Sequence, residues 1–223
     1  MEEQRVLLAK CCRMLEQSGL VNFGGHVSSR ISEEIFLINA YGKSRMEVSP
    51  EDLVETYLDG SPVDEGVKIP SEVHIHAAIY RARKDVNAVA HLHSPATVSL
   101  SIARKPFFPA IYQGTLFAGG IPIHEDARLV NTPSRGERLA KTLAEARIVI
   151  MRGHGSAVVA DSIKRLFFLS VYFENNARRL LEAYNAGNPE PLSKEEIEDG
   201  EKNLVRESVM NKLWDYFESK LDH

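Results

Sequence analysis

Three histidines have the spacing expected of ligands for one metal ion. His91 and His93 end an apolar run, residues 86–92, that we expect to form a buried strand. Because alternate residues of a strand point to the same face, both imidazoles could reach one ion. His154 stands between two glycines, which allow a sharp turn, and a third ligand from a distant turn leaves a coordination position open for catalysis. The His91/His93 pair alone, or the glycine-flanked His154 alone, would also be compatible with histidines that only form hydrogen bonds within the fold. The combination of the two predicts a site for one divalent ion. Imidazole ligands favour zinc, with manganese, iron or cobalt as alternatives.

Glu72 supplies a carboxylate that could work beside this ion. It follows Ser71 in the first turn of a predicted helix over residues 71–84. There it could simply complement the helix dipole, or it could act as a general acid/base that moves a proton between oxygen and carbon of a substrate. His76 lies one turn later on the same helix face. It could orient Glu72, contact the metal or serve the fold alone.

The elements that must position these residues alternate between helices and short strands. Amphipathic spacing predicts the helices, and short apolar runs between turn signals predict the strands. The expected helices cover residues 3–18, 50–52, 71–84, 94–103, 135–146, 161–185 and 201–220, and the expected strands cover 27–30, 34–39, 86–92, 107–117, 147–152 and 156–160. We therefore expect a single α/β domain over residues 1–223, with helices covering a mainly antiparallel sheet and a C-terminal helical extension from about residue 186.

The composition narrows the class of protein further. Of the 223 residues, 43% are hydrophobic and 26% are charged, which is typical of a globular protein with a sizeable core. The formal net charge of −4 argues against nucleic acid or an anionic membrane as a partner. The only cysteines, Cys11 and Cys12, are adjacent and form no disulfide framework, and no apolar run reaches the roughly 18 residues that span a bilayer. We expect a cytoplasmic protein that acts on a small molecule.

Four motifs together resemble the class II aldolase/adducin superfamily, over about residues 5–185. They are Gly25-His26-Val27-Ser28-Ser29-Arg30, Pro70-Ser71-Glu72 followed by His76, His91-Leu92-His93, and Arg152-Gly153-His154-Gly155. The superfamily includes metal-dependent fuculose-phosphate aldolases, ribulose-phosphate epimerases, certain decarboxylases and the non-enzymatic adducin heads. The resemblance implies a three-layer α/β/α sandwich around a central, mainly antiparallel sheet. It also implies that the three histidines hold the metal and that Glu72 is the acid/base.

The same resemblance nominates residues that would bind the substrate. They are Gly25, Arg30, Lys43, Ser44 and Ser71. The glycine and Ser71 lie within matched motifs, and Arg30, Lys43 and Ser44 could hold a carboxylate or a phosphate. For Arg30, a surface salt bridge is an equal alternative.

Departures from the aldolase pattern bear on the kind of substrate. Family aldolases usually have Gly-Asn where this chain has Gly25-His26, and a phosphate-holding Thr-Pro-Ser/Thr-Gly segment where it has residues 39–44. A tyrosine that some of them use for proton transfer falls at Gln113, beside Tyr112. A histidine in the first loop is similar to the family's decarboxylases, which act on hydroxylated aromatic carboxylates, and to adducin heads. We expect His26 to be able to carry charge near neutral pH, and so to pair with a carboxylate or donate a proton in catalysis.

Together these features predict a metal-dependent carbon–carbon lyase, in which the ion stabilises the electrons left on a small polyoxygenated substrate. Aldol-type cleavage of a sugar-like hydroxy-carbonyl compound, with or without a phosphate, ranks first. Decarboxylation of a hydroxylated aromatic or keto carboxylate ranks second and epimerisation third. A non-catalytic adducin-like binding module is the alternative from a different class.

The resemblance also implies a homo-oligomer, because members of the superfamily are commonly tetramers with sites at subunit interfaces. Within the sequence, Trp214 and Phe217 of the last predicted helix are candidates for such an interface. Packing within the chain is an equal alternative for both.

Overall fold

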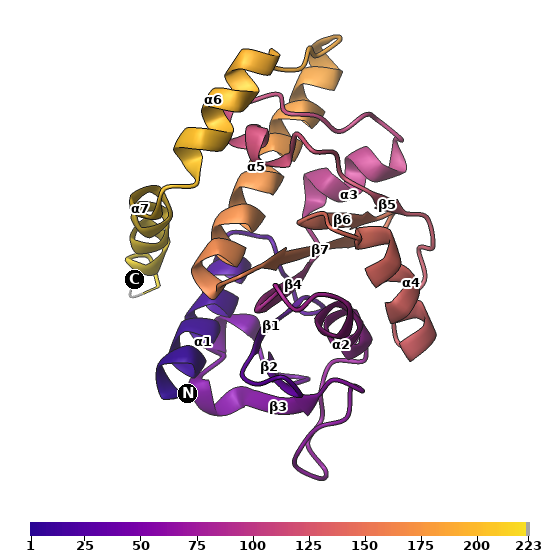
Figure 1. Cartoon of the computed structure of the whole chain (residues 1–223), viewed down its shortest axis with the longest axis vertical. Coiled ribbons are helices and arrows are strands. Elements are labelled where there is room, and N and C mark those ends of the chain that lie inside the picture. The colour runs from indigo at the N-terminus through magenta and orange to yellow at the C-terminus, as the bar shows by residue number, and fades with distance from the viewer. Residues whose placement is uncertain (222–223) are drawn as a thin grey trace.

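A seven-stranded sheet forms the middle layer of the computed structural model, which describes residues 1–221 (Figure 1). Its strands lie in the order β3-β2-β1-β4-β7-β6-β5, and neighbours are antiparallel except for the parallel pair β5 and β6. Their bounds are β1 His26–Arg30, β2 Ile35–Asn39, β3 Leu53–Tyr57, β4 Ala88–Leu92, β5 Ile123–His124, β6 Ile148–Met151 and β7 Gly155–Ala160. The mainly antiparallel sheet is confirmed, whereas residues 222–223 of the expected domain lie outside the described residues.

Helices cover both faces of the sheet, which confirms the three-layer α/β/α arrangement. Their bounds are α1 Glu2–Gln17, α2 Val73–Ala82, α3 Pro95–Ile102, α4 Pro133–Leu143, α5 Ile163–Ala186, α6 Lys194–Leu204 and α7 Glu207–Glu218, with short 3₁₀ helices η1 Arg45–Glu47, η2 Pro50–Asp52 and η3 Tyr112–Phe117. Helices α1, α5 and α7 share the core on one face, and α2 and α4 share the core on the other (Figure 1). Helix α3 packs against α5.

The alternation of residues along β1 and β4 decides which side chains face α2. In β4, Ala90 packs in the core beneath α1 and α5, while Val89 packs in the core beneath α2 and α4. His91 has the same parity as Val89, so its ring faces α2. In β1, Val27 faces the α1 side, so His26 faces α2 as well. The sheet therefore presents both histidines to the helix that begins beside Glu72.

One expected strand is wrong. Residues 107–117 form a loop that ends in η3, because the side chain of Asn176 takes the place of a neighbouring strand. The Asn176 Oδ1 accepts hydrogen bonds from the main-chain N–H groups of Ala110 at 2.9 Å and Ile111 at 3.3 Å. Its Nδ2 donates to the carbonyl oxygen of Phe108 at 2.9 Å. A proline within the stretch also removes a donor that a strand ladder would need.

The single helix expected over residues 201–220 is also wrong, because the chain turns between α6 and α7. Helix α6 packs against η3, whereas α7 packs against α5, so the two cannot continue along one axis. Trp214 of α7 is 2% exposed and packs edge-on against Phe167 of α5, and Phe217 contacts the same ring. Of the two alternatives for these aromatic residues, the structure shows packing within the chain.

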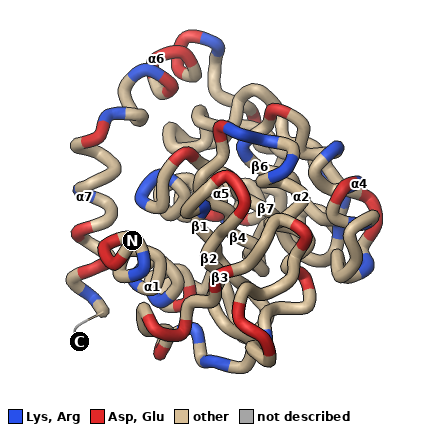
Figure 2. The backbone as a smooth tube through the Cα atoms, turned by 60° about the horizontal axis from the view of Figure 1, so that its bottom comes forward, with Lys and Arg blue, Asp and Glu red and all other residues tan. Residues whose placement is uncertain are grey.

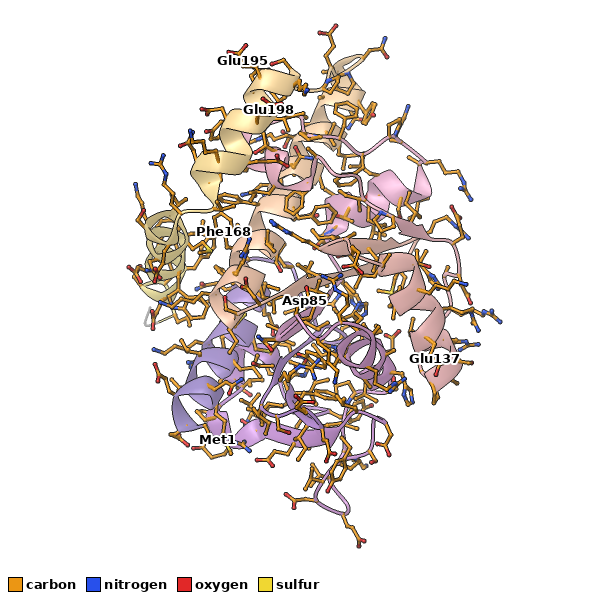
Figure 3. The ribbon with its side chains drawn as sticks, in the orientation of Figure 1. Met1, Asp85, Glu137, Phe168, Glu195 and Glu198 are labelled. Carbon is orange, nitrogen blue, oxygen red and sulfur yellow. The ribbon has the colours of Figure 1, made fainter. Side chains whose placement is uncertain are left out.

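The surface carries charges of both signs. Lysine and arginine are interspersed with aspartate and glutamate along α1, α4, α6 and α7 (Figure 2), and the acidic side chains of Glu195 and Glu198 project from α6 (Figure 3). Within residues 1–221, no helix has both the length and the apolar character that a membrane crossing requires.

Candidate metal centre

Elements that are distant in the sequence bring the nominated histidines and Glu72 together. His26 begins β1 and is the cross-strand partner of His91 in β4, and His93 directly follows β4. His154 lies in the turn between β6 and β7. Glu72 is the N-cap residue of α2, but its carboxylate makes no capping hydrogen bond and lies beside the histidines instead. The cluster therefore depends on the order β1-β4-β7 in the centre of the sheet.

Two glycines allow the third histidine to approach the end of β4. Gly153 has a φ of +68°, in the left-handed region that glycine adopts without strain. A Cβ atom at Gly155 would lie 2.2 Å from the carbonyl oxygen of Leu92 and 3.3 Å from Cε1 of His91. The turn fits against β4 only with glycine at this position, which explains why glycines flank His154.

His91, His93 and His154 fit a single divalent ion. Each offers a ring nitrogen, and these nitrogens lie within 4.8 Å of one another. The Nε2 atoms of His91 and His93 are 2.9 Å apart. Two ligands of a tetrahedral zinc site with bonds of about 2.0–2.1 Å would be about 3.3 Å apart. Since two bare lone pairs repel each other at such a distance, a proton or a cation must lie between them.

Neighbouring acceptors decide which nitrogen each histidine turns toward this centre. Nδ1 of His91 lies 3.2 Å from the carbonyl oxygen of Ser156, and Nδ1 of His93 lies 2.8 Å from Oδ1 of Asn22. These nitrogens carry the ring hydrogens, which leaves the Nε2 lone pairs for a metal ion. Nδ1 of His154 is buried without a hydrogen-bond partner among the described residues. Burial, with the neighbouring His91 and His154, lowers the pKa of His93 to about 4, which favours the neutral form that a ligand needs.

Glu72 lies beside the predicted ligands and is only 6% exposed. Its Oε2 is 3.6 Å from Nε2 of His91 and 3.5 Å from Nε2 of His154, and its Oε1 accepts a hydrogen bond from the Val130 N–H at 2.7 Å. Burial by itself raises the pKa of Glu72, but the neighbouring His154 and His91, together with the Val130 N–H, outweigh it and hold the pKa well below its usual range. Glu72 is therefore ionised, which is the state that a general base requires.

His26 is buried beside the cluster and does not carry the charge expected of it. Burial, followed by the neighbouring His76 and His91, holds the pKa of His26 well below its usual value. The expectation of a charged imidazole near neutral pH is wrong, because the charged form loses its hydration in the interior. Nor do the hydrogen bonds of His76 reach Glu72. They join His26 at 2.7 Å and Ser28 at 2.6 Å.

The residues predicted to bind the substrate differ in how close they lie to the histidine cluster. Arg30 lies at the opposite end of β1 from His26, and its guanidinium donates to three main-chain oxygens in and just after the last turn of α2, at 2.7–3.2 Å. The structure does not bring it to the histidines. Ser71 directly precedes Glu72, and both Ser71 and Ser44 are exposed.

Arg45 joins the two loops that carry Gly25 and Lys43, a role that sequence reasoning missed. It is 3% exposed and donates to the carbonyl oxygens of Gly25 at 2.6 Å, Phe23 at 3.1 Å and Lys43 at 2.5 Å. The Lys43 ammonium pairs with Asp52 at 3.4 Å. The sequence holds no signal for this burial, because an arginine in a polar loop is ordinarily exposed.

Sequence reasoning also missed Ser28 and Tyr80, for which a signal was present. Ser28 has the same strand parity as His26, and Tyr80 follows His76 by one helical turn, as His76 follows Glu72. The Tyr80 hydroxyl lies 2.8 Å from Ser28 Oγ. Both hydroxyl groups are therefore buried next to His76, on the side of His26 that faces α2.

A family model described as the Class II Aldolase and Adducin N-terminal domain matches residues 6–181. The chain therefore belongs to this family, as the four motifs implied. Membership agrees with a site for a divalent metal at the histidine cluster and with an enzyme of the aldolase or decarboxylase type.

Two relatives illustrate these types. The chain is 31% identical over 200 residues to 3,4-dihydroxyphthalate decarboxylase of Rhodococcus jostii (strain RHA1), covering 83% of this chain and 82% of that one. It is 26% identical over 199 residues to 5-deoxy-D-ribulose 1-phosphate aldolase of Bacillus thuringiensis serovar kurstaki, covering 89% and 93%. Among solved structures, L-fuculose 1-phosphate aldolase from Glaciozyma antarctica PI12 has the same fold, with a TM-score of 0.87 at 21% identity over 100% of this chain and 89% of that one.

We expect the purified protein to contain about one equivalent of divalent metal per chain, and His154→Ala to lose most of it because two imidazoles alone bind weakly. Elemental analysis of both proteins, prepared without chelator, measures this. His74→Ala changes a histidine of α2 outside the cluster and should keep the metal. Unchanged metal content in a folded His154→Ala protein would exclude His154 as a ligand.

Proposed function

We propose that this chain is a divalent-metal-dependent carbon–carbon lyase that decarboxylates a hydroxylated aromatic carboxylate. The observation that carries the lyase proposal is the meeting of three histidines with an ionised, buried Glu72. The similarity to a dihydroxyphthalate decarboxylase, over more than four fifths of both chains, supports this choice of substrate. It moves decarboxylation ahead of aldol cleavage, which the sequence analysis ranks first.

In this proposal His91, His93 and His154 hold the ion, with zinc as the first choice and manganese, iron or cobalt as alternatives. When bound, the ion would act as a Lewis acid toward oxygens of the substrate. Glu72 accepts the proton of a ring hydroxyl group. The carbon–carbon bond then breaks, its electron pair stays on the ring carbon, and carbon dioxide leaves. Glu72 returns the proton to that carbon, so that protons and charge balance.

The cations around the site support a carboxylate over a phosphate. A phosphate monoester brings nearly two negative charges and three acceptor oxygens, which call for several free donors. Arg45 is already bound to three main-chain oxygens, and Lys43 pairs with Asp52. Arg30 is engaged at the far end of β1. We propose that Gly25, Ser44 and Ser71 line the substrate position, with Lys43 at its edge.

Aldol cleavage is the second candidate, and the similarity to a deoxyribulose-phosphate aldolase over most of both chains favours it. Here Glu72 would take the proton of the hydroxyl group next to the breaking bond and return it to the carbon that keeps the electron pair. Epimerisation and a non-catalytic binding role rank below both reactions.

Replacing Glu72 by glutamine tests the shared acid/base step. Glu72→Gln keeps the shape of the side chain but cannot take up a proton, so turnover should fall by about 10²-fold or more. Elemental analysis should show that the metal stays bound. The exposed Glu137 of α4 provides the control Glu137→Gln, which should keep full activity. Wild-type turnover in Glu72→Gln would mean that Glu72 only complements the dipole of α2 and has no role in catalysis.

A paired assay separates the two reactions. Wild type and His26→Asn are compared for carbon dioxide release from 3,4-dihydroxyphthalate and for cleavage of 5-deoxy-D-ribulose 1-phosphate. If the protein is a decarboxylase, His26→Asn should lose most of the release, about tenfold or more, because the shorter amide cannot span from His76 to the substrate. Cleavage of the sugar phosphate by wild type, tolerated or improved in His26→Asn, would establish the aldolase instead.

We also propose a homotetramer, on the resemblance to the superfamily. Trp214 and Phe217 do not support this proposal, because both side chains pack within the chain. Other apolar side chains are exposed and could contact a second chain, including Phe23 at 92% and Tyr41 at 63% exposure. Light scattering should give a particle of four 25.0 kDa chains, and a clean 25.0 kDa particle would remove the proposal.

A further inference from the structure

A row of buried hydrogen bonds runs from His26 into the core beneath α2. Nδ1 of His26 lies 2.7 Å from Nε2 of His76. Nδ1 of His76 lies 2.6 Å from Ser28 Oγ, which in turn lies 2.8 Å from the Tyr80 hydroxyl. His26 is 1% exposed and the other three are 0% exposed. The hydrogens of Ser28, Tyr80 and His76, at the buried end of this His26–Tyr80 row, must therefore find their acceptors within the protein.

Two arrangements of the hydrogens are chemically consistent. Burial, together with the neighbouring His91, lowers the pKa of His76 to about 3, so its ring is neutral, with one donor and one acceptor nitrogen. In the first arrangement, His76 accepts from Ser28 and donates to His26, which then carries its hydrogen on Nε2. In the second, His76 accepts from His26 and donates to Ser28, and His26 carries its hydrogen on Nδ1.

Counting hydrogens separates the two arrangements. Burial raises the pKa of Tyr80 above its usual value, so the tyrosine keeps its hydrogen. The four residues carry four hydrogens for three contacts, so one hydrogen lies outside the row in either arrangement. In the first, Tyr80 donates to Ser28, Ser28 to His76 and His76 to His26, and the hydrogen outside the row is on Nε2 of His26, whose ring lies beside Glu72 and His91. In the second, the hydrogens of His76, Ser28 and Tyr80 share the two contacts among these residues, and one buried hydroxyl group is left without an acceptor in the row. A donor without an acceptor is most costly in the core, where Ser28 and Tyr80 are 0% exposed, whereas the hydrogen on His26 lies at the site, where a bound substrate can accept it; this favours the first arrangement.

Arg30 strengthens the same preference. Its guanidinium carbon lies 4.7 Å from the centre of the Tyr80 ring, where it withdraws electron density from the phenol. Against the larger opposite effect of burial, the charge of Arg30 lowers the pKa of Tyr80, and so favours the phenol as a hydrogen-bond donor. Arg30 thus has a function in the row, although it does not reach the predicted metal centre.

We propose that His76 and Ser28, completed by Tyr80, are positioning residues that hold His26 with its hydrogen on Nε2, the nitrogen not engaged by the row. His26 then offers the site a hydrogen-bond donor and no lone pair. It is therefore not a metal ligand, although His26, Glu72 and His91 each place a potential ligand atom within 4.8 Å of the others. Resting on the proposed function, the acceptor for this hydrogen is an oxygen of the substrate carboxylate.

Nitrogen NMR of the full-length protein, labelled with ¹⁵N in histidine, reads the hydrogen positions without any substrate. The signals of His26 and His76 are assigned from His26→Asn and His76→Gln. We expect both rings to show a protonated Nε2 and a bare Nδ1, in the zinc-loaded protein and after chelation. A hydrogen on Nδ1 of either ring, or a doubly protonated ring, overturns the proposal.

Ser28→Ala tests the source of this bias. Without the serine hydroxyl group, both arrangements leave one nitrogen of His76 unpaired, so the rings should change to a mixture of the two forms. Turnover should fall about tenfold, as for other residues that orient a functional histidine, while metal content stays the same. Ser170→Ala is the matched control, since Ser170 is an equally buried serine that donates to Leu166 in α5. It should leave the rings and turnover unchanged. A single Nε2–H form retained in Ser28→Ala would remove Ser28 from the proposal.

The same measurements keep this inference apart from the proposed function. Nε2–H rings in a protein that releases no carbon dioxide from 3,4-dihydroxyphthalate would leave the row in place and remove the decarboxylase. Carbon dioxide release by a protein with Nδ1–H rings would support the decarboxylase and remove the proposed row of positioning residues.

Discussion

Glu72 is a carboxylate in the protein interior, and such a group is stable only where N–H donors or cations surround it. The fold meets this need with the Val130 N–H and with two of the histidines nominated as metal ligands. Because the same imidazole nitrogens can serve a proton or a metal ion, protons and metal compete for the site. The arrangement of the surrounding strands follows from holding these nitrogens in place.

Three of the four histidines of the cluster take a hydrogen-bond partner from a different part of the fold. His91 uses a carbonyl of β7, His93 uses the loop before β1, and His26 uses α2. Register is therefore critical in the centre of the sheet, where His91 pairs with His26 on one side and with Ala157 on the other. A shift of β4 by one residue would turn His91 into the apolar core beneath α1.

The loop before β1 is held as closely as the strands. A Cβ atom at Gly24 would lie 2.7 Å from the ring of His93, and the buried Arg45 binds the carbonyl oxygens on either side of this glycine. Together with its bond to the Lys43 carbonyl oxygen, Arg45 thus directs three of its five N–H donors at the main chain. In the proposed function, the substrate would be held by the metal and by uncharged donors, with Lys43 at its edge.

Parity and amphipathic spacing are local properties of the chain, and they were sufficient for much of the fold. They predicted α1, α2, β4 and α5 to within a few residues, and the alternation of His91 and His93 placed both rings on one face. Contacts between distant segments were needed for the rest. Asn176 turned an expected strand into a loop, although it lies about sixty residues away in the sequence. The charge of His26 depended on burial beneath α2, which no pattern within its own loop records. Desolvation and hydrogen-bond partners are set by whichever elements pack together, so the chemistry of each imidazole was decided only when β1, β4, β7 and α2 met.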